Sequence, residues 1–287
     1  MEVGIYIRDY LEDPTRPMHE QIEEAAEVCR RARSLGFSAI YMPQHFIAHP
    51  TMWMQPMQML ARLAPDAEGL RLITGILLLT YHNPVDIADQ VVTLDHISNG
   101  RFTLGVGLGY REKELAAFGT NRKDRVSRME ESIALMKQLW TGDEITFEGK
   151  HWQVHEAKCS VTPVQKPHPP LWVACSQPES FKNAGEMGLG VLCFNLSGYG
   201  ELKRRVDLYR EGLEHANPVG SFVNAQIAAL CVIHVGEDDE EARRVAAPEG
   251  AWFVNFAEKL YAPWQGRQVP DSYKFSVNAV QTERIKL

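Results

Sequence analysis

Residues 70–107 read LRLITGILLLTYHNPVDIADQVVTLDHISNGRFTLGVG, and they indicate the fold class most clearly. The apolar run over residues 70–79 predicts a strand. A helix follows with clear ends, because Asn83 is a good cap, a proline takes the first helical position, and Asn99-Gly100 is a natural stop. Residues 102–106 then predict the next strand. Strand, helix and strand in this order are typical of a right-handed crossover in a parallel sheet.

The same alternation extends over most of the chain. An open dinucleotide-binding sheet is disfavoured, because its glycine motif normally follows the first strand, and here Arg8-Asp9-Tyr10 follow it. We therefore expect an α/β barrel of the TIM type, (β/α)8, although only seven of its strands are recognised. Besides the two strands above, strands are predicted at residues 3–7, 39–42, 171–174, 190–194 and 225–235, and helices at 22–35, 54–64, 126–140, 178–187, 199–215 and 238–247.

An interruption at residues 143–170 breaks this rhythm. Residues 145–154 predict a small hairpin that turns at Glu148-Gly149, and residues 161–170 carry four prolines and predict an extended loop. We expect residues 1–287 to form a single domain in which this insertion is placed to act as a lid.

Composition narrows the classes of function. The chain has 287 residues, of which 45% are hydrophobic, and its net charge is −7. Its only compact basic run is Lys203-Arg204-Arg205, which disfavours nucleic-acid binding. No apolar run approaches the roughly 20 residues of a membrane span, and the five cysteines are never spaced as CxxC. These features are typical of a cytoplasmic protein without a disulfide framework.

Candidate chemistry follows the strands, because the carboxyl ends of barrel strands converge on one mouth. His45, after the strand at 39–42, is the strongest catalytic candidate, although a structural histidine would look the same. His45 and His49 have the spacing of metal ligands, but no third ligand is placed beside them, so we expect no metal. Arg111 and Glu112 are expected to form a solvated pair.

Two further stretches are candidate binding elements. Gly105, Gly107 and Gly109 let the backbone approach a flat or bulky group, or simply make a tight turn. Cys175-Ser176-Gln177-Pro178 predicts the start of a helix whose free N–H groups bind an anion, although an ordinary capped helix fits equally.

The chain as a whole resembles the bacterial luciferase-like, flavin-dependent monooxygenases, a barrel superfamily that includes the coenzyme F420-dependent oxidoreductases. The resemblance runs from residue 1 to about 275. Its most specific stretches are TGILLLTYHNPVDIADQVVTLDHISNGRFTLGVGLGYREKELAAFG at 74–119, LWTGDEITFEGKHW at 139–152 and PVQKPHPPLWVA at 163–174.

The resemblance implies roles for individual residues. His45 takes the position of a histidine or acidic group near the reactive edge of the flavin. Gly75-Ile76 falls where many members hold a non-proline cis peptide that supports the flavin ring. The remaining implied contacts are ring or ribityl contacts from Gly107, Gly109 and Tyr110, and phosphate contacts from Cys175, Ser176, Gln177 and Ser180.

Two departures from the family pattern stand out. Sugar dehydrogenases that use F420 carry a glutamate directly after the glycine run, where this chain has Tyr110. Residues 276–287 do not resemble the family's last strand and helix, so we expect that part of the barrel to be missing or replaced.

The resemblance implies a monooxygenase that uses O2 and reduced FMN, supplied by a separate flavin reductase, to oxidise a small organic substrate. Family members are commonly homodimers. Hydride transfer with F420, a flavin-binding protein without turnover and a metal-dependent barrel hydrolase are the alternatives.

Overall fold

The computed structural model describes residues 1–7, 16–48, 52–195 and 198–261. His49 and the atypical tail at 276–287 lie outside these ranges. No helix among the described residues is long and apolar enough to cross a membrane. The chain forms two compact units, here called unit 1 (Met1–Ala174, Met187–Gly190 and Asn217–Ala225) and unit 2 (Cys175–Glu186, Val191–Ala216 and Gln226–Leu287).

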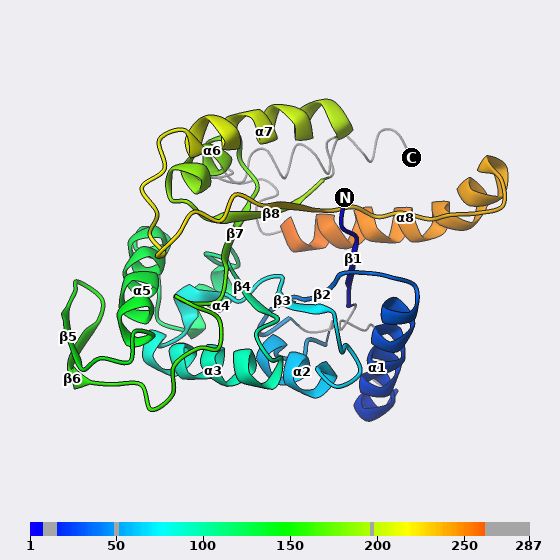
Figure 1. Ribbon diagram of the computed structural model, residues 1–287. Coiled ribbons are helices and arrows are strands. Elements are labelled where there is room, and N and C mark those ends of the chain that lie inside the picture. The colour runs from blue at the N-terminus through cyan, green and yellow to red at the C-terminus, as the bar shows by residue number, and fades with distance from the viewer. Residues whose placement is uncertain (8–15, 49–51, 196–197, 262–287) are drawn as a thin grey trace. The chain divides into compact units, whose positions relative to one another are not determined.

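Unit 1 is built on a parallel sheet with the strand order β1-β2-β3-β4-β7. Helices α1, α2 and α3 lie side by side along this sheet (Figure 1). The strands are β1 (Gly4–Tyr6), β2 (Ala39–Met42), β3 (Arg71–Thr74), β4 (Phe102–Val106) and β7 (Leu171–Cys175), and the helices are α1 (Met18–Ser34), α2 (Pro56–Leu63), η1 (Leu79–Tyr81), α3 (Pro84–Ile97), α4 (Glu112–Ala117) and α5 (Arg125–Leu139).

The ends of α3 confirm the sequence prediction. The side chain of Asn83 accepts a hydrogen bond from the backbone N–H of Val85, which satisfies one of the free donors at a helix start. At the other end, Asn99 and Gly100 both have positive φ values, of 51° and 75°, as a chain leaving a helix often requires.

Strand β3 is shorter than predicted. Residues 70–79 were expected to be one strand, but β3 ends at Thr74. The Thr74 hydroxyl donates to the carbonyl of Gly105 and accepts from its N–H, both at 2.8 Å. The next peptide, Gly75-Ile76, is cis, which confirms the cis peptide that the family resemblance implied at this position. Residues 77–79 are apolar because all three leucines are buried. Leu77 makes an isolated bridge to Val106 and Leu79 begins η1, and periodicity does not separate such buried residues from a strand.

The predicted hairpin is confirmed. Strands β5 (Ile145–Glu148) and β6 (Gln153–Ala157) pair antiparallel, and the hairpin lies beside α5 (Figure 1). The carboxylate of Glu131 on α5 accepts the backbone N–H groups of Lys150, His151 and Trp152 at 2.7–3.0 Å. One helix side chain thereby anchors the hairpin loop.

Unit 2 holds two parallel strands, β8 (Gly190–Phe194) and β9 (Ile227–Leu230), with α6 (Pro178–Glu186), α7 (Gly198–Leu213) and α8 (Asp239–Tyr261). Helices α6 and α7 approach closely because both carry a glycine at the contact. A Cβ on Gly185 would overlap the carbonyl of Tyr209, and one on Gly212 would overlap that of Lys182. The strand predicted at 225–235 ends at Leu230, because the apolar residues after it are exposed and unpaired with β8.

Candidate functional site

The candidate site lies at the carboxyl ends of β2, β3 and β4 in unit 1. These strands are parallel, so the segments that leave them emerge at one edge of the sheet. The N–H of Gly75 donates to the carbonyl of Met42 at 2.7 Å, which ties the end of β3 to the end of β2. The rings of His45 and Tyr110 meet edge to face, with centroids 5.7 Å apart. The structure thus brings the predicted residues of all three segments together.

His45 has a partner that the sequence analysis did not identify. Its Nδ1 lies 3.0 Å from Oε1 of Glu114, in the first turn of α4. The Glu114 side chain is fully buried, whereas 14% of the His45 side chain is exposed. His45 therefore joins a buried carboxylate to the accessible surface.

Glu114 accepts three other hydrogen bonds. The backbone N–H of Phe46 lies 2.9 Å from Oε1 and the guanidinium of Arg111 lies 3.1 Å from the same oxygen. The hydroxyl of Tyr81 lies 3.5 Å from Oε2. Burial alone would raise the pKa of Glu114, but the hydrogen bonds from His45 and Phe46 and the charge of Arg111 hold that pKa below its usual value.

The expected pairing of Arg111 with Glu112 is wrong. Arg111 pairs with Glu114, three residues along, and Glu112 pairs with Arg122 at 2.7 Å. Side chains three residues apart lie on one face near a helix start, whereas neighbours in sequence point apart.

The glycines of the β4 turn leave room for the protein's own side chains. A Cβ on Gly107 would overlap Cδ1 of Ile76, and one on Gly109 would overlap the hydroxyl of Tyr81. Gly109 also has a φ of 68°, a region that favours glycine. The close approach expected at these glycines is thus made by Ile76 and Tyr81, which fix the cis turn and Glu114 against the end of β4.

The accessible part of this site is apolar and aromatic. Trp53, Ile76 and Tyr110 are half-buried, and Ala174 at the end of β7 is exposed. The ring of Trp53 meets His45 edge to face at 4.7 Å. Small side chains, aromatic edges and one ionisable ring fit a flat aromatic group better than a compact ion. Among the described residues there is no cluster of His, Cys, Asp and Glu able to hold a metal.

The predicted anion site lies in unit 2. Ser176 is exposed, and α6 begins at Pro178. The hydroxyl and the N–H of Ser180 both donate to the carbonyl of Gln177, at 2.6 and 3.0 Å. Cys175 is buried, its Sγ lies 3.3 Å from the carbonyl of Ser180, and burial raises its pKa to about 12. Ser180 and Cys175 thus hold the turn together, whereas the side chain of Ser176 is exposed at the start of α6.

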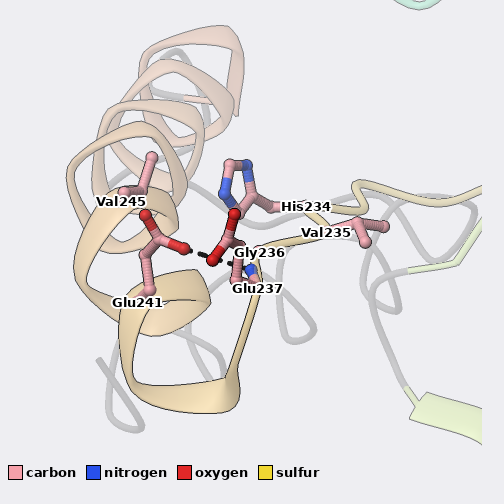
Figure 2. Close-up of a pocket in the computed structure, with 6 residues that line it drawn as sticks. All are labelled: His234, Val235, Gly236, Glu237, Glu241 and Val245. Carbon is pink, nitrogen blue, oxygen red and sulfur yellow. Dashed lines mark hydrogen bonds between the residues drawn. The ribbon is translucent and has the colours of Figure 1, made fainter.

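A surface pocket in unit 2 contains none of the predicted residues. Figure 2 shows the side chains of Glu237 and Glu241 close together beside His234, with the Glu241 carboxylate 3.1 Å from the N–H of Glu237. His234 and Glu237 are exposed. The pocket is lined by His234, Val235, Gly236, Glu237, Glu241 and Val245.

Two comparisons with known proteins indicate the same family for this chain. The model of the luciferase-like monooxygenase family matches residues 1–284. The oxygenase component of the flavin-dependent trigonelline monooxygenase of Acinetobacter baylyi is 30% identical over 261 residues, which cover 86% of this chain and 71% of that protein.

Solved structures show the same barrel fold. The oxygenating constituent of 3,6-diketocamphane monooxygenase of Pseudomonas putida, in complex with FMN, superposes with a TM-score of 0.77 at 21% identity over 92% of this chain and 75% of that one. The F420-dependent tetrahydromethanopterin reductase of Methanopyrus kandleri superposes with a TM-score of 0.71 at 19% identity, over 98% and 81%. The expected α/β barrel of the luciferase-like, TIM type is therefore confirmed.

Proposed function

Because the chain belongs to the luciferase-like monooxygenase family, we propose that it is an oxygenase that uses reduced FMN and O2 to oxidise a small organic substrate. The match to a flavin-dependent oxygenase component over 86% of the chain supports this reaction. The observation that carries the proposal is the pairing of His45 with Glu114 beside the cis Gly75-Ile76 turn.

The residues that would hold the cofactor follow from this arrangement. Gly75, Ile76, Gly107, Gly109 and Tyr110 would border the flavin ring. The phosphate contacts proposed for unit 2 come from Cys175, Ser176, Gln177 and Ser180. When bound, the reduced flavin would supply the electrons that activate oxygen. The protein would bind and orient the cofactor and the substrate and exclude water from them.

His45 is the proposed catalytic residue. One of its ring nitrogens is taken by Glu114, so the other is left to hold or deliver a proton at the reacting atoms. Trp53 and Tyr110 flank the ring and would keep water from it. Apolar side chains around a proton-transferring group strengthen its electrostatic interactions.

Partners and location complete the proposal. The name "oxygenase component" of the Acinetobacter relative supports a separate reductase that supplies reduced FMN to this chain. We further propose a cytoplasmic homodimer of single-domain subunits, in which the insertion at residues 143–170 serves as a lid.

Hydride transfer with coenzyme F420 is the second candidate function. The likeness to an F420-dependent reductase over 98% of the chain favours it. Tyr110, in place of the glutamate of F420-dependent sugar dehydrogenases, weighs against a sugar as the substrate.

A paired titration tests the proposal. Protein is titrated without oxygen with reduced FMN and with reduced F420, and oxygen is then admitted while the flavin spectrum is followed. We expect FMN to bind and the His45→Ala variant to oxygenate substrate at least about 100-fold more slowly, with unchanged FMN affinity. His19→Ala is the matched control, because His19 is exposed on α1, away from the proposed site and lid. Binding of F420 alone would overturn the FMN proposal in favour of the second candidate.

A further inference from the structure

Glu114 is a fully buried acidic side chain in contact with His45, and the sequence analysis did not single it out. Its side chain has no exposed surface, yet its helix, α4, spans only Glu112–Ala117. Burying a carboxylate is costly unless it is paired and hydrogen-bonded. Because Glu114 is buried in contact with the proposed catalytic histidine, we expect it to have a function besides stability.

The protonation of the pair follows from the donors around Glu114. Oε1 faces the N–H of Phe46 and the guanidinium of Arg111, both of which can only donate. These donors and His45 hold the pKa of Glu114 low in spite of burial. An ionised carboxylate can only accept, so Nδ1 of His45 must carry a proton, and in the neutral ring Nε2 is the nitrogen with a lone pair.

The same carboxylate also holds the loop that carries the ring. Arg111 donates to Glu114 and to the carbonyl of Phe46 at 2.8 Å. Glu114 thus binds the histidine ring, the next backbone N–H and the arginine that holds the next carbonyl. The edges of Trp53 and Tyr110 limit rotation of the ring further.

We propose that Glu114 is a positioning residue that fixes His45 in the tautomer with Nδ1 protonated, so that Nε2 is the atom that exchanges a proton during turnover. The second half of this statement rests on the proposed oxygenase function. The first half concerns the protein alone. In a catalytic triad a buried aspartate holds its histidine by the same physical means.

The test separates the two halves. Histidine labelled with ¹⁵N reports which ring nitrogen carries the proton. Turnover with reduced FMN and O2 reports kcat and the KM for reduced FMN. The variants are Glu114→Ala and the isosteric Glu114→Gln, which keeps an acceptor should the alanine variant fail to fold. Glu112→Gln is the matched control, because Glu112 lies on the same short helix with 58% of its side chain exposed.

We expect the neutral His45 ring of the wild-type protein and of E112Q to carry its proton on Nδ1. In E114A this preference is lost. Removal of a histidine's outer hydrogen-bond partner at metal sites costs about 10- to 100-fold, and we expect a fall in kcat of that size in E114A, a smaller one in E114Q, and KM within about twofold. A merely structural role would reduce the folded fraction and leave both the ring protonation and kcat of the folded protein unchanged.

A wild-type His45 that carries its proton on Nε2 would overturn the proposal, as would E114A and E114Q with wild-type ring signals and kcat. Wild-type protein that shows no reaction with reduced FMN and O2 would instead overturn the proposed function. In that case the ¹⁵N signals still decide whether Glu114 sets the tautomer.

Discussion

Two carboxylates in unit 1 have similar partners, but their ion-pair networks differ in exposure to solvent. Asp66, in the turn after α2, accepts hydrogen bonds from Arg30 at 2.5 Å and Arg62 at 2.8 Å. Glu114 accepts from Arg111 and His45. The Asp66 side chain is 16% exposed and both of its partners are more than 40% exposed. Glu114 has no exposed surface, and the exposed fractions of His45 and Arg111 are 14% and 18%. The same ion-pair chemistry is solvated in one region and enclosed in the other.

This difference indicates what each network is for. Water screens exposed charges and replaces a lost partner, so surface ion pairs contribute little to stability. In a buried pair, water cannot reach the remaining charged group when its partner is removed. A fold gains little stability from a buried pair over an apolar one, so the position of Glu114 is better explained by the geometry it imposes on His45.

The largest effect is expected from removing the buried carboxylate. Glu114→Ala leaves the N–H of Phe46, the guanidinium of Arg111 and Nδ1 of His45 without their acceptor. We expect a loss of about 3–5 kcal/mol in the free energy of unfolding, measured by denaturant titration at pH 7. Glu112→Ala, on the exposed side of the same helix, should lose less than about 1 kcal/mol. Equal losses in the two variants would remove the distinction between the regions.

The enclosure of Glu114 is tested through Gly109. A Cβ there would overlap the hydroxyl of Tyr81, which lies over Glu114, and Gly109 has a positive φ. Gly109→Ala should therefore lose about 2–4 kcal/mol, from backbone strain and overpacking together. Gly119→Ala is the control, because Gly119 also has a positive φ but nothing within 4 Å of the added carbon. A G109A variant no less stable than G119A would show that Tyr81 yields freely.

Acid should erase the contribution of Glu114. Its pKa is lower in the folded state than its ordinary value of 4.5, so the folded protein binds fewer protons and stability rises with pH. Glu114→Gln should be less stable than wild type by about 2 kcal/mol at pH 7. This difference should shrink as the pH falls below 4.5, through the folded-state pKa. A difference that stays constant from pH 7 to pH 3 would mean that charge is not the cause.

The smallest effect is expected at the surface. Asp66→Asn should lose less than about 1 kcal/mol in the free energy of unfolding at low salt. The loss should shrink further at about 1 M salt, where charges are screened within about 3 Å. Thermal unfolding at the two salt concentrations measures this. A loss as large as that of E114Q would contradict the assigned roles.

Much of the fold could be predicted from the sequence. Strands β2 and β8 were predicted with the observed ends, at 39–42 and 190–194, because each is a short apolar run with a clear start, after Ser38 in β2 and at Gly190 in β8. Strand β3 was predicted too long, since after Thr74 only Leu77 pairs, in an isolated bridge with Val106, and the other leucines are buried without strand pairing. A buried residue is apolar in the sequence whether or not it is paired in a strand.

The candidate site was predicted in part. His45 and the cis Gly75-Ile76 turn came from strand ends and from the family resemblance. Glu114 was missed, because the short helix EKELAA at 112–117 looks exposed in the sequence. One signal was available: Arg111 and Glu114 are three residues apart, the spacing at which side chains meet near a helix start.

Every role proposed for His45 and Glu114 in turnover requires a flavin ring to bind beside His45. The direct measurement is a titration of ¹⁵N-histidine-labelled protein with reduced FMN in the absence of oxygen. We predict that the ring signals of His45 shift and saturate at one FMN per chain, while those of His234, in the pocket of Figure 2, do not move. Saturable shifts at His234 with an unchanged His45 would contradict the account.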